Sequence, residues 1–190
     1  TRTRRRGVYG RPDRHAAIRL VSALIFAWAY IFLGTLLSPV VALGAWLHPR
    51  TRRHWRERIG FPAVEVEPGA AWFHAASLGE TRIVAAVVGP IRAGVAGLEL
   101  LRTCTSDTAR DGNPHTDQAL CAPLDVLPVV LCWLDRVRPR ALILVEAELW
   151  PALLVGARLR GVPTFLLAPR VGAGMARLHK LPGLAAYLLR

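Results

Sequence analysis

The stretch RPRALILVEAELWPALLVGARLRGVPTFLL, residues Arg138–Leu167, predicts a strand, a helix and a second strand in succession. Ala141–Val145 is a short continuous apolar run, as expected of a strand buried on both faces of a parallel sheet. Trp150–Arg160 has a helical composition, and Gly161 follows it as a C-cap glycine. Val162–Leu167 is again a short buried strand. A strand–helix–strand unit of this kind is the building block of parallel sheets.

The same alternation extends toward the N-terminus. Ala71–His74 predicts a strand that stops at a tight turn, followed by a helix from about Glu80 to Arg92. Leu98–Cys104 predicts another strand, and Asp125–Val137 has the apolar spacing of a helix. Leu181–Leu189 begins a further helix. The expected fold class is α/β, with a Rossmann-like, doubly wound parallel sheet.

Ligands of such sheets bind beyond the carboxyl ends of the strands. The predicted strands place four segments together on that rim: Ser77–Glu80, Thr105–Arg110, Glu146–Trp150 and Ala168–Gly174.

Glu80 is the first candidate for chemistry, because it follows a strand and a glycine-containing turn and starts a helix. One interpretation is a first-turn carboxylate favoured by the helix dipole. The other is a general base that takes a proton from an attacking hydroxyl. Ser77 and Gly79 would shape the turn and offer backbone N–H groups to a phosphate or carboxylate. His74, inside the strand, is more typical of a packed core histidine.

Other rim residues have both a structural and a binding interpretation. Of Glu146 and Glu148, one could bind a ligand and the other be structural. Trp150 is a core residue or a platform for a sugar ring. Arg110 and Arg170 are solvated surface arginines or partners of phosphate or carboxylate groups. The chain has no Asp-x-Asp pair, so no metal site is predicted.

The net charge of +12 is concentrated near the N-terminus. The first 60 residues contain twelve arginines and only Asp13 and Glu57 as acidic residues, a net charge of +10, and the other 130 residues carry +2. A nucleic-acid binder would more often carry the charge on its folded domain, so nucleic acid is not an expected partner. Arginines beside an apolar run favour anionic lipid headgroups.

That apolar run is Leu20–Leu47, 28 residues without a formal charge. It exceeds the ~20 residues that cross a bilayer as a helix and is too long for a signal peptide core. Pro39 interrupts it, so we expect either one kinked spanning helix or two shorter helices that dip in and return. Cys104, Cys121 and Cys132 have no metal-ligand spacing and, as an odd number, favour reduced thiols in a cytosolic domain.

Several ordered motifs resemble the N-terminal domain of the 3-deoxy-D-manno-octulosonic acid (Kdo) transferases. The resemblance covers about residues 50–190, and its two most specific stretches are SLGE and EAELWP. The matching motifs are RERIGF at Arg56–Phe61, WFHAASLGE at Trp72–Glu80, PLD at Pro123–Asp125, Arg138–Leu167 as quoted above, and RLHKLPGL at Arg177–Leu184.

The resemblance implies the N-terminal, acceptor-binding half of an inverting GT-B glycosyltransferase preceded by an N-terminal membrane helix. It implies CMP-Kdo as donor, a lipid A precursor (lipid IVA) as acceptor, and no cofactor or catalytic metal. It places the reaction at the cytoplasmic face of the bacterial inner membrane and the catalytic base at Glu80. Ser77, Gly79, Arg110, Glu148, Trp150 and Arg170 are the expected acceptor-binding residues. The expected organisation is a basic segment (1–19), a membrane anchor (20–47), a basic linker (48–70) and the GT-B N-terminal domain (71–190).

Two loops depart from the family pattern. The family's Asn-Ala-Arg-Leu-Ser stretch is Leu167–Gly172 here and keeps only Arg170, and the loop Cys104–Arg110 lacks the usual final glycine. The nucleotide-binding second domain of GT-B enzymes is not expected within these 190 residues, so the chain alone is expected to be inactive. The alternatives are a non-catalytic, membrane-bound lipid-binding module or another GT-B enzyme that acts on a lipid. The number of Kdo units, the acyl pattern of the acceptor and the oligomeric state do not follow from the sequence.

Overall fold

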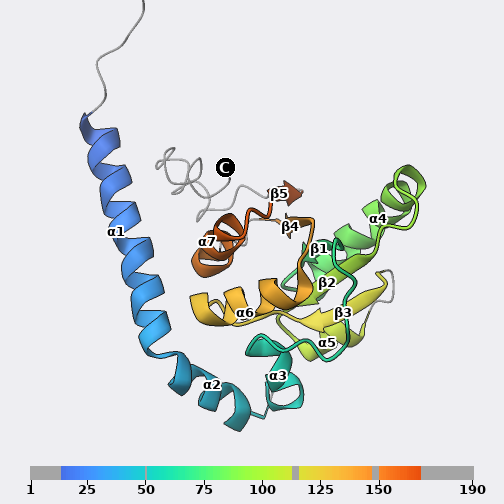
Figure 1. The fold of residues 1–190 in the computed structure, drawn as a ribbon, viewed down its shortest axis with the longest axis horizontal. Coiled ribbons are helices and arrows are strands. Elements are labelled where there is room, and N and C mark those ends of the chain that lie inside the picture. Colours follow the sequence, from blue (N-terminus) through green and yellow to red (C-terminus); the bar gives the residue numbers. More distant parts are fainter. Residues whose placement is uncertain (1–13, 50, 113–115, 147–149, 168–190) are drawn as a thin grey trace, which may run out of the picture.

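The computed structural model describes residues 14–49, 51–112, 116–146 and 150–167. Its centre is a five-stranded sheet with the order β3-β2-β1-β4-β5, in which every neighbouring pair is parallel (Figure 1). The strands are β1 (Ala71–His74), β2 (Leu100–Cys104), β3 (Gln118–Cys121), β4 (Ala141–Val145) and β5 (Thr164–Leu167). This confirms the predicted Rossmann-like parallel sheet.

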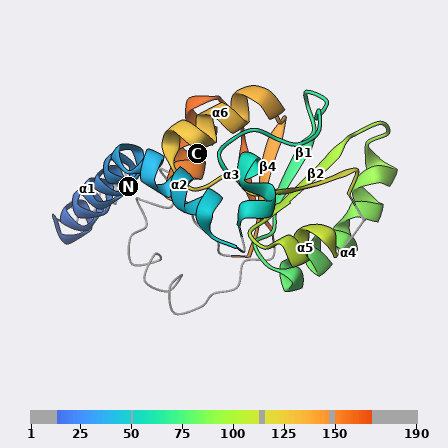
Figure 2. The same cartoon turned by 90° about the horizontal axis from the view of Figure 1, so that it is seen from below.

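Helices cover both faces of the sheet because successive side chains of a buried strand point to opposite sides. Trp72 packs with α6 (Leu127–Val137) and α7 (Pro151–Leu159), whereas Phe73 packs with α4 (Leu78–Gly94). Figure 2 shows α6 on one side of the strands and α4 and α5 (Asp107–Asp111) on the other. Both faces are therefore apolar, which explains why the strands are continuous apolar runs in the sequence.

Two short elements between Cys104 and Asp125 were not predicted. Strand β3 has four residues, and its apolar run Ala119–Ala122 is too short to identify a strand by itself. Helix α5 has five residues, too few for a periodic pattern, and is started by Ser106, whose hydroxyl accepts from the Ala109 N–H. The helix expected from Asp125 begins at Leu127 instead. The Asp125 carboxylate caps α7 by accepting from the Leu153 N–H at 2.8 Å.

The N-terminal apolar run forms two helices, α1 (Arg14–Leu36) and α2 (Ser38–Leu47). The chain bends at Leu37, and Pro39 lies in the first turn of α2, where proline is tolerated. In the described residues no single helix is both long and apolar enough to cross a membrane. The second half of α1 and the whole of α2 would meet the requirement together, but they are bent by 65°.

Helices α1 and α2 are attached to the α/β domain by a few contacts. Ile31 of α1 is buried in the core formed with α6 and α7, and the Tyr30 hydroxyl lies 3.5 Å from the Asp125 carbonyl oxygen. Helix α2 contacts α3 (Trp55–Arg58) and the 3-10 turn Arg52–His54. Large apolar side chains on α1 and α2 are nevertheless exposed: Val21, Ile25, Trp28, Tyr30, Phe32, Leu33, Leu36, Leu37, Val40, Leu43, Trp46 and Leu47.

The contact between α6 and α7 leads to a stability prediction at Gly156. A Cβ atom added there would lie 2.5 Å from Cγ1 of Val130, a fully buried, β-branched side chain with little freedom to move. We expect Gly156→Ala to lower the free energy of unfolding by about 1–3 kcal/mol, because overpacking outweighs the better helix propensity of alanine. Urea unfolding measures this. Gly94→Ala, at a helical glycine with open space around it, is the control and should leave stability unchanged or slightly higher.

Candidate functional site

The carboxyl ends of the strands lie along one edge of the sheet, as predicted. The turn after β1 is tied to the turn after β2, because the backbone N–H and the hydroxyl of Thr105 both donate to the Ala76 carbonyl, at 3.2 and 2.6 Å. The order of the strands reverses between β1 and β4, since the chain leaves β1 toward β3 and returns through α6 to β4. In open parallel sheets, the ligand crevice lies at such a switch point. The residues after β1 and β4 are therefore the first candidates for a site.

Glu80 stands at the start of α4 beside this switch point. Its Oε2 accepts from the Ala76 N–H at 2.8 Å and its Oε1 from the Ser77 hydroxyl at 2.9 Å. Ser77 is the N-cap residue and accepts from the Glu80 N–H at 3.3 Å, so the Ser77 and Glu80 side chains together cap the start of α4. The carboxylate is 6% exposed, but its immediate partners are polar rather than aliphatic. The structural interpretation of Glu80 as a first-turn residue is thus correct, and its catalytic role stays a prediction.

Gly79 is less constrained than its place in the turn suggested. A Cβ atom added to it would meet only the Ser77 hydroxyl, at an ordinary 3.7 Å. The turn itself therefore does not require glycine at this position.

Arg110 is held inside the protein by a buried carboxylate. Its Nε and Nη2 donate to Glu57 at 3.2 and 2.9 Å, and Glu57 is 1% exposed. Glu57 also accepts from the Cys121 N–H at 2.5 Å, at the end of β3. Arg110 thus has an internal partner that sequence reasoning did not find, and its proposed contact with a ligand stays a prediction.

Arg58 makes a second link of the same kind. Its guanidinium donates to the Thr105 carbonyl at 2.9 Å and to the Asp107 carboxylate at 3.1 Å. Glu57 and Arg58, both buried in α3, therefore hold the loop after β2 and the end of β3. The RERIGF motif at Arg56–Phe61 contains this signal as two adjacent opposite charges within the segment expected to be a basic linker (48–70).

The end of β4 shows local backbone strain. Glu146 has a φ angle of 59°, a left-handed conformation that is uncommon for a non-glycine residue. Its N–H donates to the Leu167 carbonyl at 2.9 Å, which holds this conformation at the end of the sheet. Strain of this kind is often retained at functional sites. Glu148 and Arg170, two of the predicted binding residues, lie outside the described residues, as does the predicted helix Leu181–Leu189.

His74 and Trp150 meet across the switch point, where β1 and β4 end. Their ring centroids are 4.9 Å apart and the planes are nearly perpendicular, at 77°. Trp150 is the N-cap residue of α7 and packs partly against the core. His74 is buried as a core histidine would be, and burial lowers its pKa to about 4. The imidazole is therefore neutral at physiological pH.

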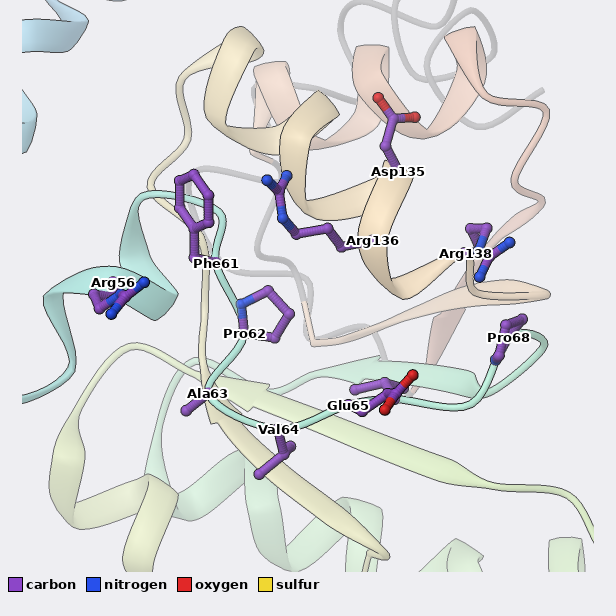
Figure 3. Close-up of a pocket in the computed structure, with 11 residues that line it drawn as sticks. Arg56, Phe61, Pro62, Ala63, Val64, Glu65, Pro68, Asp135, Arg136 and Arg138 are labelled. Carbon is purple, nitrogen blue, oxygen red and sulfur yellow. The ribbon is translucent and has the colours of Figure 1, made fainter.

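A cavity of about 710 Å³ lies elsewhere, between α6 and the segment Phe61–Pro68 (Figure 3). Arg138, which lines it, precedes β4, so this part of the cavity is at the amino edge of the sheet. The guanidinium of Arg136 lies 4.2 Å from the centre of the Phe61 ring. None of the predicted site residues lines this cavity. In the described part of the chain, no group of three or more His, Cys, Asp or Glu side chains is placed to hold a metal ion.

The sheet order and the residues at its carboxyl edge define a Rossmann-like α/β domain whose topological switch point lies between β1 and β4. The chain belongs to the Kdo transferase family: the family described as "3-Deoxy-D-manno-octulosonic-acid transferase (kdotransferase)" matches residues 53–190.

Three relatives agree with this assignment. The chain is 33% identical over 144 residues to "Probable 3-deoxy-D-manno-octulosonic acid transferase, mitochondrial" of Arabidopsis thaliana, which covers 71% of this chain and 32% of that protein. It is 33% identical over 161 residues to "3-deoxy-D-manno-octulosonic acid transferase" of Bordetella pertussis, covering 74% and 36%. The Haemophilus influenzae protein of that name is 29% identical over 146 residues, covering 74% and 34%. The chain thus matches about a third of the length of these relatives.

The low pKa of His74 leads to a pH prediction. The imidazole has its ordinary pKa of 6.5 in the unfolded chain and about 4 in the folded one, so only the unfolded state gains this proton between those values. The contribution of neutral His74 to the free energy of unfolding is fully present above pH 6.5. It falls by up to about 3 kcal/mol as the pH decreases toward 4. Urea unfolding at pH 7.0 and 4.5 should show a drop that is about 2–3 kcal/mol smaller in His74→Gln than in the unmodified chain. Equal drops would contradict the assignment.

Proposed function

We propose that this chain is the membrane-associated, acceptor-binding half of a GT-B Kdo transferase. In this proposal Kdo is transferred from CMP-Kdo to a lipid A precursor such as lipid IVA, in the synthesis of the lipopolysaccharide core. The observation that supports the proposal most directly is the position of Glu80. It is the one acidic residue of the SLGE motif, and it lies at the carboxyl end of β1 beside the switch point of the sheet.

The reaction is a single displacement with inversion at the anomeric carbon of Kdo. The acceptor hydroxyl oxygen forms a bond to that carbon while the bond between the carbon and the phosphate oxygen of CMP-Kdo breaks. CMP leaves with the electron pair, and the hydroxyl proton passes to the Glu80 carboxylate. The hydrogen bonds from Ala76 and Ser77 fix both carboxylate oxygens, so that little motion is needed before the proton is transferred.

The donor is bound by the part of the enzyme that the chain does not match. The chain corresponds to about a third of each relative, and GT-B enzymes bind the nucleotide mainly on a second Rossmann-like domain. No metal or other cofactor is required in this scheme. The acceptor would contact the rim through Ser77, Gly79, Arg110, Glu148, Trp150 and Arg170.

The apolar side chains of α1 and α2 attach the domain to the cytoplasmic face of the bacterial inner membrane. They are large and exposed along both helices, and clusters of exposed apolar side chains mark interaction sites. The arginines beside them, Arg52 and Arg53, are suited to anionic headgroups. Attachment concentrates the enzyme on the surface that contains its lipid acceptor.

The catalytic assignment is tested by Glu80→Gln in a two-domain enzyme. The chain is joined to the C-terminal part of the Bordetella pertussis relative, and transfer from radiolabelled CMP-Kdo to lipid IVA is measured. We expect turnover to fall at least about 100-fold, because a general base contributes 10²–10⁴-fold. The amide keeps the shape of the carboxylate and can still accept from Ala76, so thermal stability and vesicle binding should be retained.

The matched control is Glu99→Gln, a carboxylate that accepts from the Glu67 N–H near the opposite edge of the sheet. It should keep full turnover. Near-normal turnover of Glu80→Gln would rule out the catalytic role. A stable chimera that binds vesicles but transfers no sugar would favour the alternative of a non-catalytic lipid-binding module. Transfer from a UDP-sugar instead of CMP-Kdo would favour another lipid-directed GT-B enzyme.

Membrane attachment is tested on α2 with the double variant Val40→Glu/Leu43→Glu. Both side chains are exposed, and placing carboxylates there removes apolar contact and adds repulsion from anionic lipid. We expect co-sedimentation with phosphatidylglycerol vesicles to fall at least about 10-fold in apparent affinity. Val95→Glu, at an exposed valine after α4, is the control and should bind as the unmodified chain does. Unchanged binding of the double variant would contradict the proposed surface.

A further inference from the structure

Three buried polar side chains of the neighbouring strands β1 and β2 are joined by hydrogen-bond contacts. The Trp72 indole N–H donates to the Thr103 hydroxyl oxygen at 2.8 Å. The same hydroxyl lies 3.1 Å from Nδ1 of His74. All three residues are almost completely inaccessible to solvent. Their hydrogen atoms must therefore be arranged among themselves rather than with water.

Counting donors and acceptors decides which nitrogen of His74 carries the proton. The Thr103 hydroxyl oxygen already accepts from Trp72, and among the described residues the only acceptor within its reach is Nδ1 of His74. If Thr103 donates to Nδ1, the imidazole proton is on Nε2 and a single donor remains unpaired. If the proton were on Nδ1, both the Thr103 hydroxyl hydrogen and the Nε2 lone pair would be unpaired. The first arrangement leaves fewer buried polar groups without a partner and is the favoured tautomer.

The Nε2 atom of His74 is buried and has no hydrogen-bond partner among the residues that the structure describes. Such an atom in a native structure calls for a role, because an unpaired buried donor costs free energy. The neighbouring aromatic group is the Trp150 indole, nearly perpendicular to the imidazole. A positive N–H edge against a negative aromatic face is a favourable contact of perpendicular rings.

We infer that His74 is a positioning residue of the acceptor site: Thr103 fixes it as a neutral Nε2–H donor, and in that form it fixes the orientation of the Trp150 indole. The tautomer stands on the structure alone, and the consequence for the acceptor rests on the proposed function.

The contact between His74 and Trp150 joins two parts of the fold that border the candidate site. His74 ends β1, and the chain continues through Ala75 and Ala76 to the turn that contains Glu80. Trp150 is the N-cap residue of α7, the helix that follows β4. The His74–Trp150 contact therefore links the end of β1 to the start of α7. An indole held in place at the switch point offers a fixed side wall to a sugar ring, whereas a rotating indole would have to be ordered at each binding event.

Three substitutions separate the parts of this inference. Thr103→Val keeps the shape of the side chain but removes the hydroxyl that selects the tautomer. His74→Phe keeps an aromatic ring and removes the N–H. His74→Gln has an amide nitrogen that reaches about as far as Nε2, so it restores a donor without the imidazole.

The tautomer is read by long-range ¹H–¹⁵N NMR of the whole chain, labelled with ¹⁵N-histidine in detergent micelles and assigned by the loss of one signal in His74→Gln. We expect His74 to show the pattern of an Nε2–H imidazole at pH 7, and Thr103→Val to shift it toward the Nδ1–H form. An Nδ1–H pattern in the unmodified chain, or no change in Thr103→Val, would overturn the inference. This measurement needs no transfer activity, so it does not depend on the proposed function.

The positioning role is read by steady-state kinetics of the two-domain enzyme. We expect His74→Phe to raise KM for lipid IVA about 10-fold, with KM for CMP-Kdo and the melting temperature nearly unchanged, and His74→Gln to recover most of the loss. Equal KM values in all three forms, or equal losses in Phe and Gln, would overturn the positioning role. Failure of the proposed function would instead appear as absence of transfer in the unmodified chimera. In that case the role is judged by the orientation of Trp150, read from the NMR cross-peaks between its indole and the core side chains it packs against. Their loss in His74→Phe but not in His74→Gln supports the positioning role, and unchanged cross-peaks in both variants would overturn it.

Discussion

The ionic contact between Glu57 and Arg110 is the constraint on which the rim depends. Glu57 is almost fully buried, and its charge is compensated by the guanidinium of Arg110 and by the Cys121 N–H. A buried charge is retained only where it has partners of this quality, and removing one partner commonly costs about 3–5 kcal/mol. Because the three groups come from α3, α5 and β3, this single carboxylate fixes the short elements that are too small to be stable by themselves. The loop after β2 then presents its polar groups beside the turn that contains Glu80.

A second capping contact connects the N-terminal helices to the other half of the rim. Asp125 accepts from the first turn of α7, and burial raises the pKa of its carboxyl group above the ordinary value despite this hydrogen bond. Tyr30 of α1 contacts the backbone of the same residue. Trp150 is the N-cap residue of α7, so α1, the Asp125 cap and the indole that contacts His74 all support the start of this helix. The rim is thus supported on one side by α3 and on the other by α1.

The sequence predicted those parts of the fold that have an apolar pattern of sufficient length. Ala71–His74 and Ala141–Val145 were found with their correct bounds, because continuous apolar runs are required of strands buried on both faces. Gln118–Cys121 and α5 were missed because their structure depends on contacts with distant residues. The same reason explains the site. Glu80 was visible as a carboxylate after a strand and a glycine turn, whereas the internal partner of Arg110 lies 53 positions away and could be found only in three dimensions.

If the proposed function holds, the two supports of the rim connect the membrane-attachment helices to the catalytic site. Helix α2, whose apolar side chains are exposed, contacts α3, and α3 holds the loop after β2 through Glu57 and Arg58. A membrane surface that orders α2 would therefore act on the same short helix that positions one side of the crevice. The opposite side, where His74 meets Trp150, is linked to the same N-terminal part of the chain through α1, which contacts α7. If the proposed function holds, a lipid surface that orders α1 and α2 would act on both sides of the rim, and the rim would reach its binding geometry most completely there.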